Sequence, residues 1–364
     1  MCKQNDKYVV LTAGGTGGHV YPAEALAAEL KRRGCSVSLF TDSRGVKNYK
    51  GMLTEIKNRA ICSGAMVGRS AVFKIMSLCK VGIGVLQAMF YLIKQRPCCV
   101  VGFGGYASFP TAVAAIILRI PLIIHEQNSV MSRTNRVLAK FTSLVAVSFR
   151  KTQYVPEKAK TILSGMPVRE KIVKLYEKKY SFHDDKINII VLGGSQGAKV
   201  FTEVVPQAIT TLDKNCQKKI CVFQQCRKGD EEIVKKQYEG AECEVVVASF
   251  FENMAELYEK GSMIISRAGA SSVYEIAAVG MPAIFVPLPT AADNHQYYNA
   301  KEFADGNSCE LISQQDFDAD KLKCVLENMI ANPKRLNEMA EFAKKSAIVD
   351  AAKRLADGLE SVCK

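Results

Sequence analysis

Residues 8–19 read YVVLTAGGTGGH, a short apolar run followed by four glycines and a histidine. The apolar run predicts a buried strand, and the glycines predict a tight loop. Residues 22–33 then predict a helix that ends at Gly34, and residues 36–40 predict a second strand. Strand, loop, helix and strand in this order predict a βαβ unit of a parallel sheet.

The same pattern begins again at residues 187–198, which read INIIVLGGSQGA. Further strands are expected in both halves, each followed by a loop of small or polar residues. Open α/β sheets bind ligands at the carboxyl ends of their strands. We therefore predict an α/β fold of two Rossmann-like, doubly wound domains that face each other across a cleft, one at residues 1–164 and one at residues 165–347.

The composition is typical of a folded protein with an anionic partner. Hydrophobic residues make up 48% and charged residues 23% of the 364 residues, which excludes disordered, collagenous and coiled-coil classes. Lys and Arg (49) outnumber Asp and Glu (36), so the net charge is +13, which favours nucleic acid, a phosphorylated substrate or an acidic membrane. The basic residues are scattered and no nucleic-acid motif is present, so we expect no nucleic-acid partner.

The cysteines and the amino terminus indicate a cytoplasmic chain. The 13 cysteines form no CxxC pair, so we expect reduced thiols that behave as small hydrophobic side chains. Residues 1–7 are polar and lead directly into the first strand, so we expect no signal peptide.

Residues 71–93 are apolar apart from Lys74, Lys80 and Gln87. The two lysines argue against a transmembrane span. Apolar side chains recur at three- and four-residue steps, which predicts an amphipathic helix: Val72, Ile75, Met76, Cys79, Ile83, Leu86 and Phe90. This helix either faces the core or lies in a membrane interface, with Lys74, Lys80, Lys94 and Arg96 near phosphates.

The first glycine loop is suited to a phosphate, because glycines let backbone N–H groups approach a ligand closely. It is neither a P-loop nor a good dinucleotide fingerprint, yet Asp42 at the end of the next strand keeps a nicotinamide enzyme open. His19 is the first side chain beyond the glycines and is a candidate general base. The structural alternative is a histidine that caps or packs the helix.

Other strand ends also carry glycines or polar residues, at positions 102–108, 125–128, 193–198, 266–272 and 293–296. Glu275 either binds a ribose diol or completes a capping box with Ser272. Asp316, Asp318 and Asp320 lack the spacing of a calcium loop, so we assign them to the start of a helix and expect no metal.

Six motifs occur in one order along the chain: GGTGGH (14–19), GGYAS (104–108), HEQN (125–128), GGSQGA (193–198), SRAGA (266–270) and DNHQ (293–296). Together they resemble the MurG family, the N-acetylglucosaminyltransferases of peptidoglycan synthesis. The resemblance implies a GT-B fold and inverting transfer of N-acetylglucosamine from its UDP donor, without a metal or cofactor. The acceptor would be the C4 hydroxyl of MurNAc in undecaprenyl-pyrophosphoryl-MurNAc-pentapeptide (lipid I), and the product lipid II.

The resemblance also implies where the substrates bind. The second domain would hold UDP, and the first would hold the acceptor diphosphate and associate with the membrane through the helix at 71–93. A last helix at about 348–364 would pack back on the first domain. The protein would be peripheral, on the cytoplasmic face of the bacterial inner membrane, whose anionic lipids would account for the basic surplus.

Residue roles follow by position in the motifs. His19 is our first choice, and Glu126 our second, for the base that takes the acceptor proton. Glu275 would bind the ribose, the Phe251 backbone the uracil, and Ser195 and Arg169 the donor diphosphate. Further substrate contacts would come from Thr16, Gly17, Gly18, Asn128, Ala270, Ser271, Ser272, Val273, Tyr274 and Gln296. Met166 stands where the family's GNPVR segment has Asn, which removes an amide from the linker.

Three alternatives stay open on the sequence alone. Another glycosyltransferase or a UDP-sugar epimerase could share this scaffold. A nicotinamide oxidoreductase would bind its cofactor at the first glycine loop. A non-enzymatic membrane scaffold would leave the glycine and polar strand-end loops without an explanation.

Overall fold

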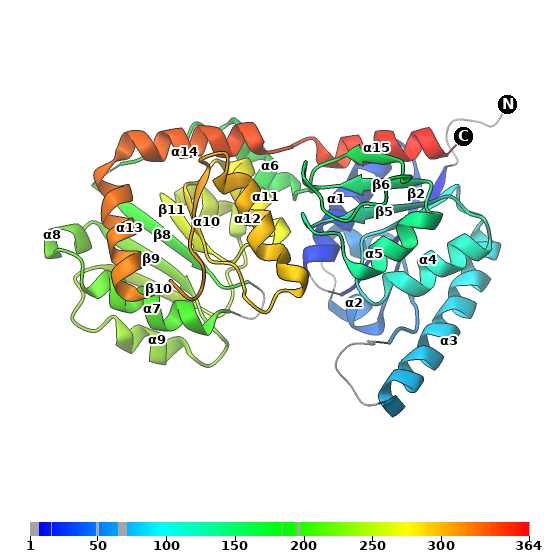
Figure 1. The fold of residues 1–364 in the computed structure, drawn as a ribbon, viewed down its shortest axis with the longest axis horizontal. Helices are drawn as coiled ribbons and strands as arrows, with labels where there is room; N and C mark the ends of the chain where they lie inside the picture. The colour runs from blue at the N-terminus through cyan, green and yellow to red at the C-terminus, as the bar shows by residue number, and fades with distance from the viewer. Residues whose placement is uncertain are drawn as a thin grey trace. The chain divides into compact units, whose positions relative to one another are not determined.

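The structure, a computed structural model, describes residues 7–15, 17–48, 51–64, 71–183, 185–194 and 197–363. The chain divides into two compact units (Figure 1). Unit 1 comprises Met1–Arg169 together with Asp350–Lys364, and unit 2 comprises Glu170–Val349. The first division thus falls after Arg169, a few residues later than the expected boundary at 164, and the end of the chain belongs to unit 1.

Unit 1 contains a parallel sheet with the strand order β3-β2-β1-β4-β5-β6-β7. Its strands are β1 (Tyr8–Thr12), β2 (Ser36–Thr41), β3 (Lys57–Ala60), β4 (Cys99–Gly102), β5 (Leu122–Glu126), β6 (Leu144–Val147) and β7 (Thr161–Leu163). The order reverses between β1 and β4. Such a switch point opens a crevice at the carboxyl ends of the two strands, where ligands bind.

Helices cover both faces of this sheet because successive strand residues point to opposite sides. Val9 and Leu11 pack in a hydrophobic cluster with α1 and α15, whereas Val10 packs with α3, α4 and α5. The helices of unit 1 are α1 (Gly17–Arg32), α2 (Ser43–Asn48), α3 (Ala71–Gln95), α4 (Ser108–Ile117), α5 (Arg133–Leu138) and α15 (Ala351–Val362), with 3₁₀ turns η1 (Gly51–Thr54) and η2 (Ala139–Phe141).

Helix α1 begins earlier than its sequence predicts. The expected start was residue 22, but the helix begins at Gly17 and Pro22 lies inside it. Glycine is a poor helix former, which is why the pattern indicated a loop there. The consequence is that Gly17, Gly18 and His19 form the first turn of α1, where backbone N–H groups lack helical partners.

Unit 2 contains a parallel sheet with the order β10-β9-β8-β11-β12-β13, which reverses between β8 and β11. Its strands are β8 (Ile187–Leu192), β9 (Ile220–Gln225), β10 (Glu244–Ala248), β11 (Met263–Ser266), β12 (Ala283–Phe285) and β13 (Cys309–Leu311). Its helices are α6 (Glu170–Val173), α7 (Lys199–Thr210), α8 (Lys214–Gln217), α9 (Glu231–Gln237), α10 (Met254–Lys260), α11 (Ala270–Val279), α12 (His295–Ala304), α13 (Ala319–Ala331) and α14 (Pro333–Ser346), with 3₁₀ turns η3 (Lys174–Glu177) and η4 (Ala292–Asn294). The predicted class of two parallel-sheet α/β domains is confirmed.

The acidic residues before α13 act as helix-start residues. Asp318 is the N-cap, and its carboxylate accepts a hydrogen bond from the Lys321 backbone N–H at 2.8 Å. This satisfies one of the unpaired donors at the helix start.

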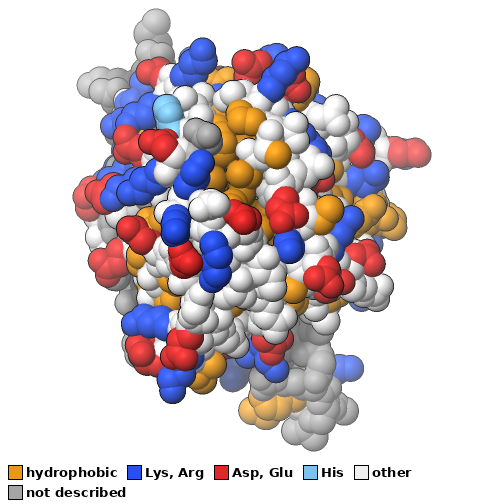
Figure 2. All heavy atoms as spheres, turned by 90° about the vertical axis from the view of Figure 1, so that its left-hand side faces the viewer, with side chains coloured by type: hydrophobic (Ala, Val, Ile, Leu, Met, Phe, Trp, Pro, Cys, Tyr) orange, Lys and Arg blue, Asp and Glu red, His pale blue; other side chains and the backbone are white. Residues whose placement is uncertain are grey.

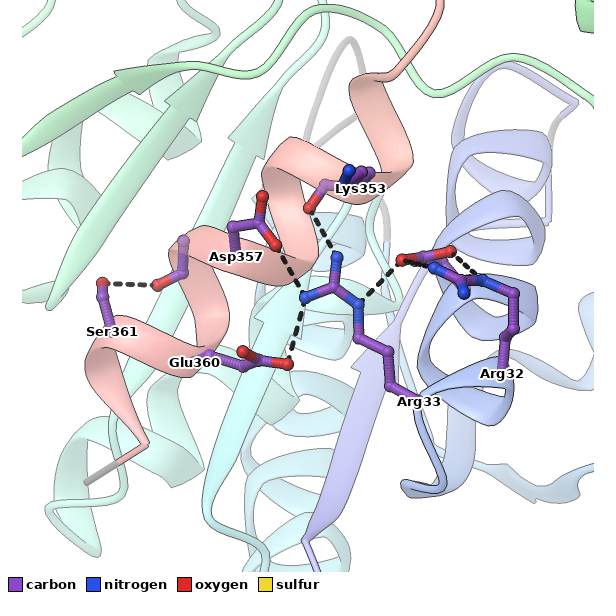
Figure 3. Close-up of polar contacts among 8 residues, drawn as sticks. Arg32, Arg33, Lys353, Asp357, Glu360 and Ser361 are labelled. Atoms are coloured by element: carbon purple, nitrogen blue, oxygen red, sulfur yellow. Dashed lines mark hydrogen bonds and ion pairs between the residues drawn. The ribbon is translucent and has the colours of Figure 1, made fainter.

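The C-terminal helix α15 docks on unit 1 through an arginine and an apolar face (Figure 3). The guanidinium of Arg33, at the end of α1, lies 2.7 Å from Asp357 and 3.0 Å from Glu360, and donates to the Lys353 carbonyl. Leu355 and Leu359 are fully buried in the same cluster as α1. Polar and apolar contacts therefore fix this helix on one face of the sheet.

Helix α3 exposes an apolar face. Its buried positions follow a narrow stripe of mostly small residues, Ser77, Val81, Gly84, Ala88 and Leu92. A Cβ at Gly84 would lie 2.0 Å from the Cys62 carbonyl oxygen, so only glycine permits this contact. The exposed large apolar side chains are Phe73, Ile75, Met76, Leu78, Ile83, Leu86, Phe90 and Ile93. The core-facing interpretation is therefore wrong for Ile75, Met76, Ile83, Leu86 and Phe90, while the Val72 side chain lies outside the described residues.

By length and composition, α3 is also a candidate membrane span. Among the described residues, Phe73–Gln95 is the one helix long and apolar enough to cross a membrane, with a mean hydropathy of 1.6 and 28% of its most apolar window buried. Figure 1 shows the first turns of α3 extending beyond the rest of unit 1. One such helix is weak evidence for a span, but its exposed face needs an explanation.

Basic and acidic side chains are intermixed on the face drawn in Figure 2, with blue Lys and Arg beside red Asp and Glu. Local ion pairs occur along helices of the described chain, such as Lys174 with Glu170 and Lys301 with Asp305. Exposed pairs of this kind contribute little to stability. The net positive charge is therefore not gathered into one block on this face.

Replacing Arg33 with Ala should weaken the docking of α15. Loss of a half-buried arginine with several partners should lower the free energy of unfolding by about 1–2 kcal/mol, which corresponds to roughly 2–8 °C in Tm for a unit of this size. Thermal unfolding measures the change. The matched control is Arg32→Ala, because Arg32 is exposed and its ion pair within the described residues is with Glu29. An equal loss in both variants would contradict the role of Arg33.

Candidate active site

Two glycine loops meet at the switch point of unit 1. The Gly14 backbone N–H donates to the Gly104 carbonyl at 3.0 Å. A Cβ at Gly105 would lie 2.8 Å from the Gly14 Cα, and Gly104 and Gly105 have φ of +84° and +80°. Side chains cannot fit here, and L residues rarely adopt these angles. The loops after β1 and β4 are therefore held in direct backbone contact.

A chain of hydrogen bonds fixes the tautomer of His19. The Phe103 carbonyl accepts from Nε2 of Gln127 at 2.6 Å, which turns the Gln127 Oε1 toward Nδ1 of His19 at 2.7 Å. Because Oε1 can only accept, Nδ1 carries the proton and Nε2 keeps the lone pair. The ring also lies against Gly104, where a Cβ would be 3.3 Å from its Cε1.

His19 is held in the neutral form. Burial lowers the pKa of His19, and the hydrogen bonds to Gln127 and to the Phe103 backbone oppose that shift only in part. His19 lies in the first turn of α1 and its side chain is half-buried. A neutral imidazole with a free lone pair can take a proton from a hydroxyl group, which is the chemistry of a general base.

Glu126 organises its own loop. Its buried carboxylate accepts from the backbone N–H of Asn128 at 3.0 Å and of Ser132 at 2.9 Å, and from Nδ2 of Asn135 at 2.8 Å. Burial raises the pKa of Glu126, and these hydrogen bonds oppose the shift. Since both oxygens already accept from the loop, the geometry favours His19 over Glu126 as the base. The same loop holds Asn128, whose side-chain amide lies 3.5 Å from Glu126.

His125 connects β5 to the segment at 165–169. Its Nε2 donates to the Gly165 carbonyl at 3.0 Å, and burial lowers the pKa of His125 to about 4. Ser148 Oγ donates to the Glu126 carbonyl and lies 3.8 Å from the Met166 sulfur. The Met166 side chain is thus buried against the Ser148 hydroxyl, at the position where the family pattern has the side-chain amide of Asn. Its thioether is a weak acceptor and donates no hydrogen bond.

Positive charge gathers near the start of α1. The Arg169 guanidinium lies 4.5 Å from the ring centroid of Tyr21, and Tyr21 contacts the first helical residue, Gly17. No acidic residue occupies the first turn. A helix start with an arginine nearby suits an anionic group. Gly17 and Gly18 lie at this start, whereas Thr16 lies outside the described residues.

Asp42 caps a local turn at the start of α2. Its buried carboxylate accepts from the Gly45 backbone N–H at 2.7 Å, at the start of α2. The carboxylate therefore has a local structural role. The position of Asp42 at a strand end, which had left a nicotinamide-binding enzyme as an alternative, is explained without a ribose.

The loop after β8 in unit 2 is also shaped by glycine. A Cβ at Gly193 would lie 2.2 Å from the Ala198 nitrogen, and one at Gly197 would lie 3.0 Å from the Arg227 nitrogen. Gly194 has φ of +83°. The chain therefore turns tightly before α7 begins, as in phosphate-binding loops. Ser195, the residue expected at the diphosphate, lies outside the described residues.

Helix α11 begins directly after β11, with Gly269 as its N-cap. Ser271 Oγ is buried and has no hydrogen-bond partner within the described part of the chain. Ser272 lies inside the helix, so the capping box with Glu275 is wrong. Val273 is fully buried, and the Tyr274 ring meets Phe303 edge-on. Of the five residues expected to contact substrate, Ala270, Ser271 and Ser272 thus lie at a helix start, whereas the side chains of Val273 and Tyr274 lie in the core.

Glu275 and Gln296 place polar side chains in two helices of unit 2, α11 and α12. Glu275 is buried and accepts from the Tyr258 hydroxyl at 3.3 Å. Gln296 accepts from the Leu288 backbone N–H at 2.9 Å through Oε1, which leaves its amide N–H groups as donors. Phe251 is half-buried in the segment before α10. Glu275 thus lies in α11, Gln296 in α12 and Phe251 in the loop before α10.

Two residues that organise these loops were missed by sequence reasoning. Gln127 stood inside the quoted HEQN motif without a role, although a polar residue beside a buried strand end is a signal. Arg267 is buried and donates to the carbonyls of Val286 and Pro287 and to Gln314. Burial lowers its pKa. Its guanidinium fixes the loop after β12 against the loop after β11.

Comparison with known proteins places this geometry in a family. The glycosyltransferase family 28 N-terminal domain matches residues 9–147, and the family 28 C-terminal domain matches residues 188–355. A Paramagnetospirillum magneticum protein, named UDP-N-acetylglucosamine--N-acetylmuramyl-(pentapeptide) pyrophosphoryl-undecaprenol N-acetylglucosamine transferase, is 40% identical over 96% of this chain and 95% of its own. A Rhodospirillum rubrum protein of that name is 40% identical over 96% and 90%.

The chain belongs to the MurG family of glycosyltransferases. A crystal structure of MurG from Acinetobacter baumannii has a TM-score of 0.78 and 32% identity, and the match covers 98% of this chain and 99% of that one. A UDP-GlcNAc 2-epimerase from Neisseria meningitidis has a TM-score of 0.68 at 12% identity, over 97% and 100% of the two chains. That second likeness shows a shared fold alone.

Replacing Gly105 with Ala tests the backbone contact in this member of the MurG family. The new Cβ would overlap the Gly14 Cα and occupy a left-handed conformation, so the free energy of unfolding should fall by about 1–3 kcal/mol. Chemical denaturation measures the loss. Gly82→Ala is the control, because its Cβ in helix α3 would meet nothing within 4 Å and alanine favours helix. A stable Gly105→Ala protein would contradict the assigned contact.

Proposed function

We propose that this protein transfers N-acetylglucosamine from UDP-N-acetylglucosamine to the C4 hydroxyl of MurNAc in undecaprenyl-pyrophosphoryl-MurNAc-pentapeptide, which gives lipid II. The observation that carries the proposal is the neutral His19, whose Nε2 lone pair is fixed at the switch point of unit 1. The names of the family relatives supply the donor and the acceptor.

The reaction is a single in-line displacement at the anomeric carbon. The acceptor oxygen forms the new bond as the bond from that carbon to the UDP oxygen breaks, so the configuration inverts. His19 Nε2 takes the acceptor proton, and the electron pair of the broken bond leaves with UDP. Glu126 acts through the loop that positions Asn128. A correctly aligned base of this kind contributes about 10²–10⁴-fold to the rate.

Unit 1 binds the acceptor, in this proposal. The start of α1 offers backbone N–H groups to the acceptor diphosphate, and Thr16, Gly17 and Gly18 approach the transferred sugar. Arg169, whose guanidinium lies over the Tyr21 ring, supplies a positive charge to the donor diphosphate. Electrostatic stabilisation by fixed donors is usually a large part of such catalysis.

Unit 2 binds the donor. The loop at 193–198, with Ser195, and the start of α11 at Ala270–Ser272 offer backbone and hydroxyl donors to the diphosphate of UDP. The buried carboxylate of Glu275 accepts from the ribose hydroxyls, and the Phe251 backbone meets the uracil. Gln296 donates its remaining amide N–H groups to the sugar. Helix starts and backbone donors then stabilise the charge of the departing UDP.

The exposed apolar face of α3 would bring the enzyme to the membrane that holds its lipid-linked acceptor. Phe73, Ile83, Leu86 and Phe90 point away from unit 1, and Lys74 and Lys80 are exposed on the same helix. An amphipathic helix with these features lies in a membrane interface and is attracted to anionic lipids. We propose a peripheral enzyme on the cytoplasmic face of the bacterial inner membrane.

The proposed function is tested by transfer of labelled N-acetylglucosamine from its UDP donor to a lipid I analogue, with EDTA present. His19→Ala should lower kcat by about 10²–10⁴-fold, whereas Glu275→Ala should raise the donor KM by about 10–100-fold, as expected for a lost charged hydrogen bond. Lys235→Ala, on exposed α9, is the control. Absence of transfer by folded wild-type protein, or release of epimerised UDP-sugar, would contradict the assignment.

The pH dependence of kcat tests the hydrogen-bond chain. Because the base must be neutral and burial lowers the His19 pKa, the acid limb of the wild-type profile should lie below pH 6.5. Gln127→Glu places a carboxylate beside the Nδ1 proton, so the His19 pKa should rise and the acid limb should move up by about one pH unit. Gln127→Leu should lower kcat by about 10–100-fold, as for other partners that orient a functional histidine. An unchanged acid limb in Gln127→Glu would refute the arrangement.

Membrane association is tested by sedimentation with vesicles that contain anionic lipid. Phe90→Glu should weaken binding by about tenfold or more, because an apolar side chain is lost from the interface and a negative charge is added. Phe342→Glu, an exposed change on α14 of unit 2, is the matched control. Equal binding by the Phe90 variant and wild type would rule out α3 as the membrane surface.

A further inference from the structure

Three cysteine thiols meet at the amino-terminal end of the unit 1 sheet. Cys98 directly precedes β4, Cys99 begins it, and Cys363 follows the last residue of α15. Their sulfur atoms all lie within 4.8 Å of one another. The Cys363 and Cys98 sulfurs are 2.9 Å apart, although 265 positions separate these residues in the chain. The docking of α15 therefore assembles the cluster.

The three sulfurs are close enough to share a metal ion. Zinc binds thiolate sulfur at about 2.3 Å, so sulfurs around one such ion lie roughly 4 Å apart. The Cys98 and Cys363 sulfurs, at 2.9 Å, would separate by about 1 Å when the ion binds. Within the described residues, this is the one group of three or more His, Cys, Asp or Glu side chains close enough to share an ion. A purely sulfur donor set favours soft metal ions over magnesium or calcium.

The surroundings are apolar. Cys99 and Cys363 are buried and belong to the hydrophobic cluster that includes Leu355 and Leu359 of α15, and Cys98 packs against it. A disulfide between Cys98 and Cys363 would involve only two of the three sulfurs. A metal ion would use all three sulfurs, which lie within 4.8 Å of one another, and this favours a metal over a disulfide.

We propose that Cys98, Cys99 and Cys363 form a binding site for a thiophilic metal ion such as Zn²⁺, which fastens the end of the C-terminal helix to the sheet. Binding replaces S–H bonds with S–Zn bonds and releases the thiol protons to solvent, so no oxidant or reductant is consumed. The ion complements Arg33, which holds the same helix through Asp357 and Glu360 (Figure 3).

The site has a structural role rather than a catalytic one. Cys98 pairs with Tyr8 at the beginning of β1, whereas His19 follows the end of that strand. Five strand residues span roughly 15 Å. The ion would therefore lie at the opposite end of the sheet from the base. The proposal does not depend on the proposed function.

The test is titration of the reduced, metal-free full-length protein with Zn²⁺ against a chromogenic chelator, together with thermal unfolding. Wild type should bind one equivalent tightly and gain Tm. Cys363→Ser, at the end of the chain, should bind at least about 100-fold more weakly, since loss of even an outer partner of a metal site costs 10–100-fold. Cys98→Ser should behave alike. Cys324→Ser and Cys79→Ser, which remove exposed cysteines, are the controls.

Cobalt substitution gives a second readout, because Co²⁺ bound by thiolates absorbs through sulfur-to-metal charge transfer. That band should be present in wild type and absent in Cys363→Ser. Equal Zn²⁺ affinity in wild type and Cys363→Ser would overturn the proposal, and so would a Cys98–Cys363 disulfide that persists without metal uptake. Transfer activity with EDTA should be the same in Cys363→Ser and wild type, so failure of the site is distinguishable from failure of the proposed function.

Discussion

The backbone contact between Gly14 and Gly105 is the constraint on which the unit 1 site depends. It joins the loops that follow β1 and β4, the two strands on either side of the switch point. With these loops in contact, His19 in the first turn of α1 lies against the loop after β5. The Phe103 carbonyl orients Gln127 of that loop toward His19. A backbone contact that tolerates no side chain thus determines where His19, the proposed base, is held.

Unit 2 uses the same topology for a different chemical task. Its loop at 193–197 also turns on glycines, and Arg267 replaces direct backbone contact as the group that holds neighbouring loops together. What it presents are a helix start, the carboxylate of Glu275 and the amide of Gln296. In the proposed function these groups recognise hydroxyls and phosphates rather than abstract a proton. One fold would then serve two halves of a reaction because function lies in the strand-end loops.

The sequence predicts the strands, the glycine loops and the family, because buried apolar runs and glycine clusters are local signals. It misplaces the start of α1, since glycines are poor helix formers and only tertiary contacts keep Gly17 helical. It leaves two options for the helix at 71–93 because the same periodicity suits a core and an interface. The position of Gln127 at a strand end is a local signal, but its role depends on where the Phe103 carbonyl points. The thiol cluster depends on residues far apart in the chain and has no local signal.

The ¹⁵N NMR spectrum of the His19 side chain over a range of pH, assigned by comparison with His19→Gln, measures the tautomer and charge of this ring directly. We expect a neutral ring at pH 7 with the proton on Nδ1 and the lone pair on Nε2, and a titration midpoint below pH 6.5 because burial lowers the His19 pKa. A charged imidazolium at pH 7, or a neutral ring with the proton on Nε2, would contradict this arrangement.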